Sequence, residues 1–158
     1  MPDLMSDLFS RLKEKKWTMA TAESCTGGLI AAAITAVPGS SAVFDRGFIT
    51  YSNQSKTEML EVRDDILETH GAVSEQTAAA MVTGALRKSR AQLAVAVTGI
   101  AGPDGGTAEK PVGLVFIGYG LRGQEPKVAR HNFSGPRESV REQTAGAALN
   151  YALSLLDG

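Results

Sequence analysis

The chain has 158 residues, of which 43% are hydrophobic and 21% charged, and its formal net charge is −1 at pH 7. This balance is ordinary for a globular protein and supplies no overall attraction to nucleic acid or to acidic membranes. The single cysteine, Cys25, excludes an intramolecular disulfide framework and a multi-cysteine metal site. No apolar run approaches the ~20 residues needed to span a bilayer. We therefore expect one domain, residues 1–158, in the cytoplasm, with no nucleic-acid or membrane partner.

Hydrophobic periodicity predicts helices that alternate with strands. Apolar residues at helical spacing, together with capping signals, predict helices over residues 3–15, 27–37, 53–60, 63–71, 75–88 and 136–156. Runs rich in β-branched and aromatic residues predict strands over residues 17–22, 43–52, 92–99, 112–120 and 127–134. Strands that alternate with helices in this way are typical of α/β domains.

The character of the individual elements predicts how they are arranged. Residues 92–99 form a nearly continuous apolar run, which favours a central strand covered on both faces. Residues 127–134 alternate and favour an edge strand. Thr26 and Ser74 are expected to cap the helices that follow them, and Pro136 suits the start of the last helix. We predict a three-layer α/β/α sandwich with a mixed, mostly parallel sheet.

The segment "TAESCTGGLIAAAI", residues 21–34, places an acid, two hydroxyls, a thiol and two glycines just before a helix. Backbone amides at Gly27 and Gly28 could hold an oxyanion or a phosphate at that helix start. The simpler interpretation is that Thr26 caps the helix and the glycines allow close packing. Cys25 as a nucleophile would need one of only two histidines, and a buried apolar thiol is the better prediction.

A second cluster is "TYSNQSK", residues 50–56. Lys56 falls in the first turn of a predicted helix, where the helix dipole disfavours a positive charge. If the amine is also buried, its pKa should fall, as a lysine general base requires. A solvated surface lysine is the alternative. A serine–lysine pair assisted by the Tyr51 hydroxyl would need no histidine.

A glycine-rich loop, "TGIAGPDGG" at residues 98–106, follows the apolar strand. Loops at the carboxyl edge of an α/β sheet commonly bind ligands, although a loop that merely turns the chain explains the glycines equally well. Arg137 stands at the start of the last helix, where an anion nearby would favour it. No pattern of metal ligands appears, so we expect no metal ion, and hydrolysis by a serine nucleophile would need no organic cofactor.

Five blocks, "TAESCTGG", "GFITYSNQSK", "HGAVSEQTA", "AVTGIAGPDGG" and "KPVGLVFIG", together resemble the CinA C-terminal domain family, the PncC-type nicotinamide mononucleotide deamidases. The resemblance spans roughly residues 8–155 and looks like the stand-alone form of the family. It implies an amidase that converts nicotinamide mononucleotide and water to nicotinic acid mononucleotide and ammonia, in NAD recycling.

The resemblance also implies roles for individual residues. Ser24 would be the nucleophile, Lys56 its base, and Tyr51 a relay or orienting group. The expected substrate-binding residues are Thr26, Gly27, Gly28, Thr98, Gly99, Gly102 and Arg137. Two alternatives remain open: a serine amidase for a different amide, and a non-catalytic nucleotide-binding or interaction module linked to competence or DNA damage. A homo-oligomer is compatible with all of these features.

Overall fold

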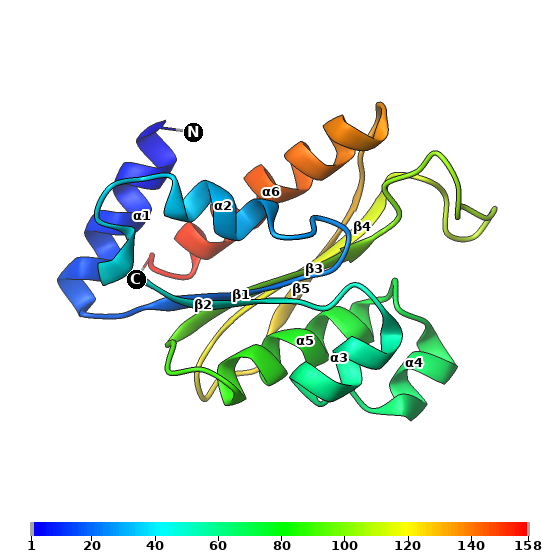
Figure 1. Cartoon of the computed structure of the whole chain (residues 1–158), viewed down its shortest axis with the longest axis horizontal. Coiled ribbons are helices and arrows are strands. Elements are labelled where there is room, and N and C mark those ends of the chain that lie inside the picture. The colour runs from blue at the N-terminus through cyan, green and yellow to red at the C-terminus, as the bar shows by residue number, and fades with distance from the viewer. Residues whose placement is uncertain (1, 158) are drawn as a thin grey trace.

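The computed structural model describes residues 2–157 as a five-stranded sheet between two layers of helices (Figure 1). The strands are β1 (Met19–Glu23), β2 (Phe44–Ile49), β3 (Leu93–Gly99), β4 (Leu114–Leu121) and β5 (Lys127–Asn132). The helices are α1 (Pro2–Lys15), α2 (Leu29–Thr35), α3 (Asn53–Leu60), α4 (Asp64–His70), α5 (Glu75–Arg87) and α6 (Arg137–Ser154), with a short 3-10 helix η1 (Ser40–Ala42).

The sheet has the order β2-β1-β3-β4-β5. Strand β1 pairs in parallel with both β2 and β3, whereas β4 pairs antiparallel with β3 and with β5. Only β4 therefore runs against the other strands, which confirms the predicted mixed, mostly parallel sheet. The predicted central strand is β3 and the predicted edge strand is β5.

Helices α1, α2 and α6 lie on one side of the sheet, and α5 lies on the other, with α3 and α4 packed against it (Figure 1). Large apolar side chains of β1, β3 and β4 pack under α1, α2 and α6, and alternate residues of β1 and β3, all alanines, pack under α5. The small alanines let α5 lie close to the sheet. Within residues 2–157 no helix is long and apolar enough to cross a bilayer.

Helix α3 lies close against α5 because position 84 is a glycine. A Cβ atom on Gly84 would stand 2.0 Å from the carbonyl oxygen of Leu60, so any larger residue would push the two helices apart. The predicted cap of α5 is confirmed, since the Ser74 side chain accepts a hydrogen bond from the amide of Thr77 at 3.1 Å. Helix α6 begins at Arg137, with Pro136 in the N-cap position.

The prediction that Thr26 caps α2 is wrong. The helix begins only at Leu29, and Gly28 occupies the N-cap position with a left-handed backbone, φ 109°. The Thr26 hydroxyl instead donates to the Glu23 carboxylate at 2.6 Å. The turn between β1 and α2 is therefore longer than the local pattern predicts.

Candidate active site

The carboxyl ends of three neighbouring parallel strands bring the candidate residues together. Hydrogen bonding continues one step past the strands: the amide of Ser24 donates to the carbonyl of Val97 at 3.1 Å, and that of Thr50 to the carbonyl of Glu23 at 2.8 Å. Residues that follow β1, β2 and β3 thus lie at one edge of the sheet, where open α/β sheets bind ligands.

A cavity of about 170 Å³ opens at this edge. Six of the predicted site residues line it, together with the buried thiol and three small apolar residues. The lining residues are Ser24, Cys25, Tyr51, Lys56, Ala72, Val73, Thr98, Gly99, Ala101 and Arg137.

Two of the residues that line the cavity, Ser24 and Lys56, are in hydrogen-bonding contact with each other. The Nζ atom of Lys56 lies 2.9 Å from Ser24 Oγ, 2.8 Å from the carbonyl oxygen of Thr50 and 3.2 Å from that of Tyr51. A neutral amine satisfies this arrangement by donating to the two carbonyls and accepting the serine proton. An ammonium satisfies it by donating to all three oxygens. The geometry therefore suits both states of a base that takes and returns a proton.

The burial of Lys56 favours the neutral form of its amine, which is the form that can act as a base. The Lys56 side chain is only 1% exposed, and none of its hydrogen-bond partners is a carboxylate. Burial lowers the pKa of Lys56 from 10.5 to about 8. Helix α3 holds the amine in place, because the Ser52 side chain caps the helix through the amide of Ser55. Of the two alternatives, the structure therefore shows a buried lysine and not a solvated surface lysine.

Cys25 does not carry the features of a nucleophile. Its side chain is buried, and burial raises the pKa of the thiol to about 11, so the thiolate is scarce at neutral pH. Neither His70 nor His131 lines the cavity, and His131 instead contacts the Tyr151 hydroxyl at 2.8 Å. The predicted buried thiol is confirmed.

The expectation that the amides of Gly27 and Gly28 form an oxyanion site is wrong. The Gly27 amide donates to the carbonyl of Ser24 at 3.1 Å, and the Gly28 amide donates to the carboxylate of Glu23 at 3.2 Å. The structure itself therefore uses both donors, and the acid directly before Ser24 is the signal that could have shown this for Gly28. The Thr26 hydroxyl is consumed by the same carboxylate.

Tyr51 and Arg137 stand at the mouth of the cavity. The Tyr51 side chain is 62% exposed. Arg137 donates to the carbonyl of Gly102 at 2.8 Å and to the Tyr51 hydroxyl at 3.4 Å. The hydroxyl thus contacts Arg137, whereas Lys56 reaches Ser24 directly, so the structure does not contain the expected relay through Tyr51. Gly102 contributes by holding Arg137 rather than by lining the cavity.

Thr98 and Gly99 form the floor at the end of β3. The Thr98 hydroxyl donates to the carbonyl of Ala72 at 2.7 Å, which ties β3 to the loop between α4 and α5. That loop supplies Ala72 and Val73 to the cavity wall. Thr98 therefore shapes the wall, and its hydroxyl already has an acceptor.

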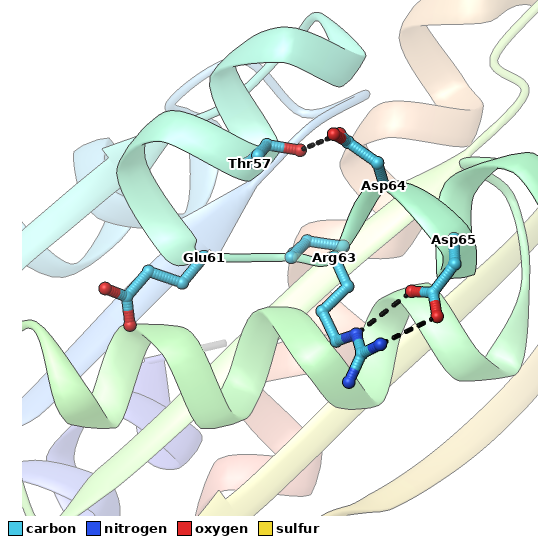
Figure 2. Close-up of a pocket in the computed structure, with 6 residues that line it drawn as sticks. Thr57, Glu61, Arg63, Asp64 and Asp65 are labelled. Carbon is cyan, nitrogen blue, oxygen red and sulfur yellow. Dashed lines mark hydrogen bonds and ion pairs between the residues drawn. The ribbon is translucent and has the colours of Figure 1, made fainter.

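A larger, open pocket of about 630 Å³ lies between α3 and α4. Figure 2 shows its side chains: the Thr57 hydroxyl donates to Asp64, and Arg63 forms two hydrogen bonds with Asp65. Arg63 and Asp65 form an exposed ion pair, Thr57 and Asp64 share a hydrogen bond, and the pocket has no hydroxyl beside a buried base. Among residues 2–157 no three His, Cys, Asp or Glu side chains are grouped to hold a metal ion.

Comparison with known proteins places this geometry in context. The sequence model of the CinA C-terminal domain family matches residues 2–156 of the chain. The chain is 52% identical to the nicotinamide-nucleotide amidohydrolase PncC of Enterobacter agglomerans over 151 residues, covering 96% of this chain and 92% of that protein. It is 54% identical to a CinA-like protein of Syntrophobacter fumaroxidans, covering 88% of this chain but only 32% of that longer protein.

The solved structures agree on the fold. The competence/damage inducible protein CihA from Agrobacterium tumefaciens superposes with a TM-score of 0.95 at 47% sequence identity, covering 98% of this chain and 94% of that one. The chain thus matches almost all of some relatives and about a third of others.

Proposed function

The chain belongs to the CinA C-terminal domain family, and from this premise we propose that it is a nicotinamide-nucleotide amidohydrolase. The proposed reaction converts nicotinamide mononucleotide and water to nicotinic acid mononucleotide and ammonia, in NAD recycling. The relative from Enterobacter agglomerans, which matches over nearly its whole length, carries the name of this activity. The observation that supports the proposal most directly is the 2.9 Å contact between Ser24 Oγ and a buried Lys56.

In the proposed mechanism Lys56 acts as a neutral general base. It takes the proton of Ser24 as Oγ attacks the carboxamide carbon, and the resulting ammonium gives that proton to the departing ammonia. An acyl-enzyme remains on Ser24. Lys56, neutral again, then removes a proton from the attacking water, and the returned proton releases Ser24 and the carboxylic acid. The positive charge on the substrate's pyridinium ring withdraws electrons and makes the amide carbon more susceptible to attack.

The volume of the cavity suggests which part of the substrate lies inside it and which part lies at its mouth. Small-molecule sites usually measure about 300–1,000 Å³, whereas this cavity is about 170 Å³. The carboxamide and ring are therefore placed inside, and the ribose and phosphate at the mouth. There Arg137, together with the loop that begins with Thr98, Gly99 and Gly102, would receive the phosphate.

We propose that residues 1–158 act as a single catalytic domain in the cytoplasm, with no metal or organic cofactor. The rival serine amidase would use the same Ser24–Lys56 pair on an amide without a phosphate. The rival interaction module would use the cavity only to hold a ligand. Neither rival explains both a desolvated amine beside a serine and an arginine at the cavity mouth.

The test is ammonia release from nicotinamide mononucleotide, its riboside and free nicotinamide. The purified chain should prefer the mononucleotide, and Ser24→Ala should release no ammonia while keeping the wild-type circular dichroism spectrum. Equal rates on all three amides would favour a general amidase. No release from any of them would favour the interaction module.

A further inference from the structure

Glu23 is a buried carboxylate that the proposed mechanism does not use. It is the last residue of β1, directly before Ser24, and only 1% of it is exposed. No ion pair joins it to a cation among the described residues 2–157. Its partners are four donors from the turn and the first residues of α2. These are the Thr26 hydroxyl at 2.6 Å and the amides of Gly28, Ile30 and Ala31 at 3.2, 2.9 and 3.0 Å.

A buried charge with so many hydrogen bonds is a strong local anchor. Charge-assisted hydrogen bonds are roughly twice as strong as neutral ones, and the helix start favours a negative charge. The anchor is rigid on its strand side, because Glu23 pairs with Ile49 of β2 and with Val97 of β3. Ser24 therefore lies between the end of β1, which the sheet fixes, and a turn that is hydrogen-bonded to the Glu23 carboxylate.

Arg141 also binds this turn. From α6 it donates to the carbonyl of Cys25 at 3.1 Å and to that of Thr26 at 2.9 Å. Glu23 thus accepts hydrogen bonds from N–H and O–H groups of the turn, and Arg141 donates hydrogen bonds to carbonyl groups of the same turn. Neither side chain lines the cavity, so neither contacts the part of a substrate that lies inside it.

We infer that Glu23 is a positioning residue that keeps Ser24 Oγ within hydrogen-bonding reach of Lys56 Nζ, with Arg141 as its counterpart. This inference rests on the proposed role of Ser24 as nucleophile. A local cap such as serine would satisfy fewer amides of α2. A carboxylate reaching back from the strand satisfies them and also fixes the turn that carries the nucleophile.

The primary test is Glu23→Gln, compared with Glu142→Gln on the exposed surface of α6. The glutamine oxygen can accept three of the four hydrogen bonds, but its NH₂ group would face the amide of Ala31, donor against donor. Because a displacement of about 1 Å can cost on the order of 100-fold in rate, we expect kcat for the mononucleotide to fall ~10- to 100-fold. KM should change less than about threefold, since the cavity wall is intact. Glu142→Gln should match the wild type.

Two readouts separate this inference from the proposed function. A fluorophosphonate probe reports the reactivity of Ser24 without nicotinamide mononucleotide, and Glu23→Gln should be labelled at least about tenfold more slowly than the wild type. A crystal structure of the variant should show Ser24 Oγ beyond hydrogen-bonding distance of Lys56 Nζ. If the wild-type chain is labelled but releases no ammonia, nicotinamide mononucleotide is not its substrate. The difference in labelling rate between the wild type and Glu23→Gln then decides the role of Glu23. If the wild type is not labelled either, the crystal structure decides.

Further outcomes would overturn the inference. One is Glu23→Gln with kcat and labelling within twofold of the wild type. Another is a variant that keeps the 2.9 Å contact, or one in which kcat and KM worsen together. If Glu23→Gln does not fold, Thr26→Val removes one of the four donors at nearly constant volume. That variant should lower kcat several-fold with KM unchanged, and wild-type kinetics would again refute the role of Glu23.

Discussion

The pH dependence of the reaction tests the base directly. Burial lowers the pKa of Lys56 to about 8, and only the neutral amine can take the proton of Ser24. Activity must therefore rise with pH. We expect kcat/KM to increase about tenfold per pH unit below ~8 and to level off above it, because this ratio reports the pKa of the free enzyme.

The magnitude follows from the lowered pKa. With a pKa of about 8, roughly one lysine in ten is neutral at pH 7 and one in a hundred at pH 6. With the ordinary value of 10.5, only about three in 10,000 would be neutral at pH 7. Burial therefore raises the active fraction ~300-fold at neutral pH. A rate that is still climbing above pH 10 would show that Lys56 is not desolvated in solution.

The assay is the initial rate of ammonia release between pH 6 and 10. The phosphate of the substrate also titrates near pH ~6, so the riboside, which lacks it, serves as the control substrate. The limb that belongs to Lys56 should appear with both substrates. A limb seen only with the mononucleotide would belong to the phosphate.

Lys56→Arg completes the test, because a guanidinium stays protonated and cannot act as a base. This variant should lose at least about 1,000-fold in kcat/KM, within the range that general base catalysis supplies. Lys127→Arg on the exposed edge strand should leave the rate unchanged. A Lys56→Arg enzyme within tenfold of the wild type would refute proton abstraction by this residue.

Three further predictions address the nucleophile, the phosphate and metals. Ser24→Ala should abolish ammonia release while Cys25→Ala keeps most of it, because the buried thiol has a pKa of about 11; the reverse pattern would assign the attack to the cysteine. Arg137→Ala should raise KM for the mononucleotide by roughly 10- to 100-fold, the equivalent of a charged hydrogen bond, and barely affect the riboside. Equal losses on both substrates would argue against a phosphate contact. Dialysis against EDTA should leave the rate unchanged, whereas loss with recovery on added zinc or magnesium would reveal a metal requirement.

Local patterns were sufficient to predict most of the fold. The apolar run of β3, the edge position of β5 and the Ser74 cap are each predicted from a few neighbouring residues, and the structure confirms them. Lys56 was also identifiable, because the first turn of α3 is unfavourable for a positive charge, which favours the neutral amine that a base requires. Such features are visible in the sequence because helix and strand periods act over short distances.

The sequence alone therefore determined the order and type of the elements and the candidate residues at the ends of the strands. Only the tertiary structure decided which polar groups are available for chemistry. Ser24 and Lys56 are 32 positions apart, and Arg141 reaches a carbonyl 116 positions away. Of the two amides that the local pattern offered to a substrate, Gly28 donates to Glu23 and Gly27 to the carbonyl of Ser24. The hydrogen bonds of Lys56 and Arg141 form because the fold brings strand ends and helices that are distant in the sequence close together in space. The local sequence around each residue does not contain that information.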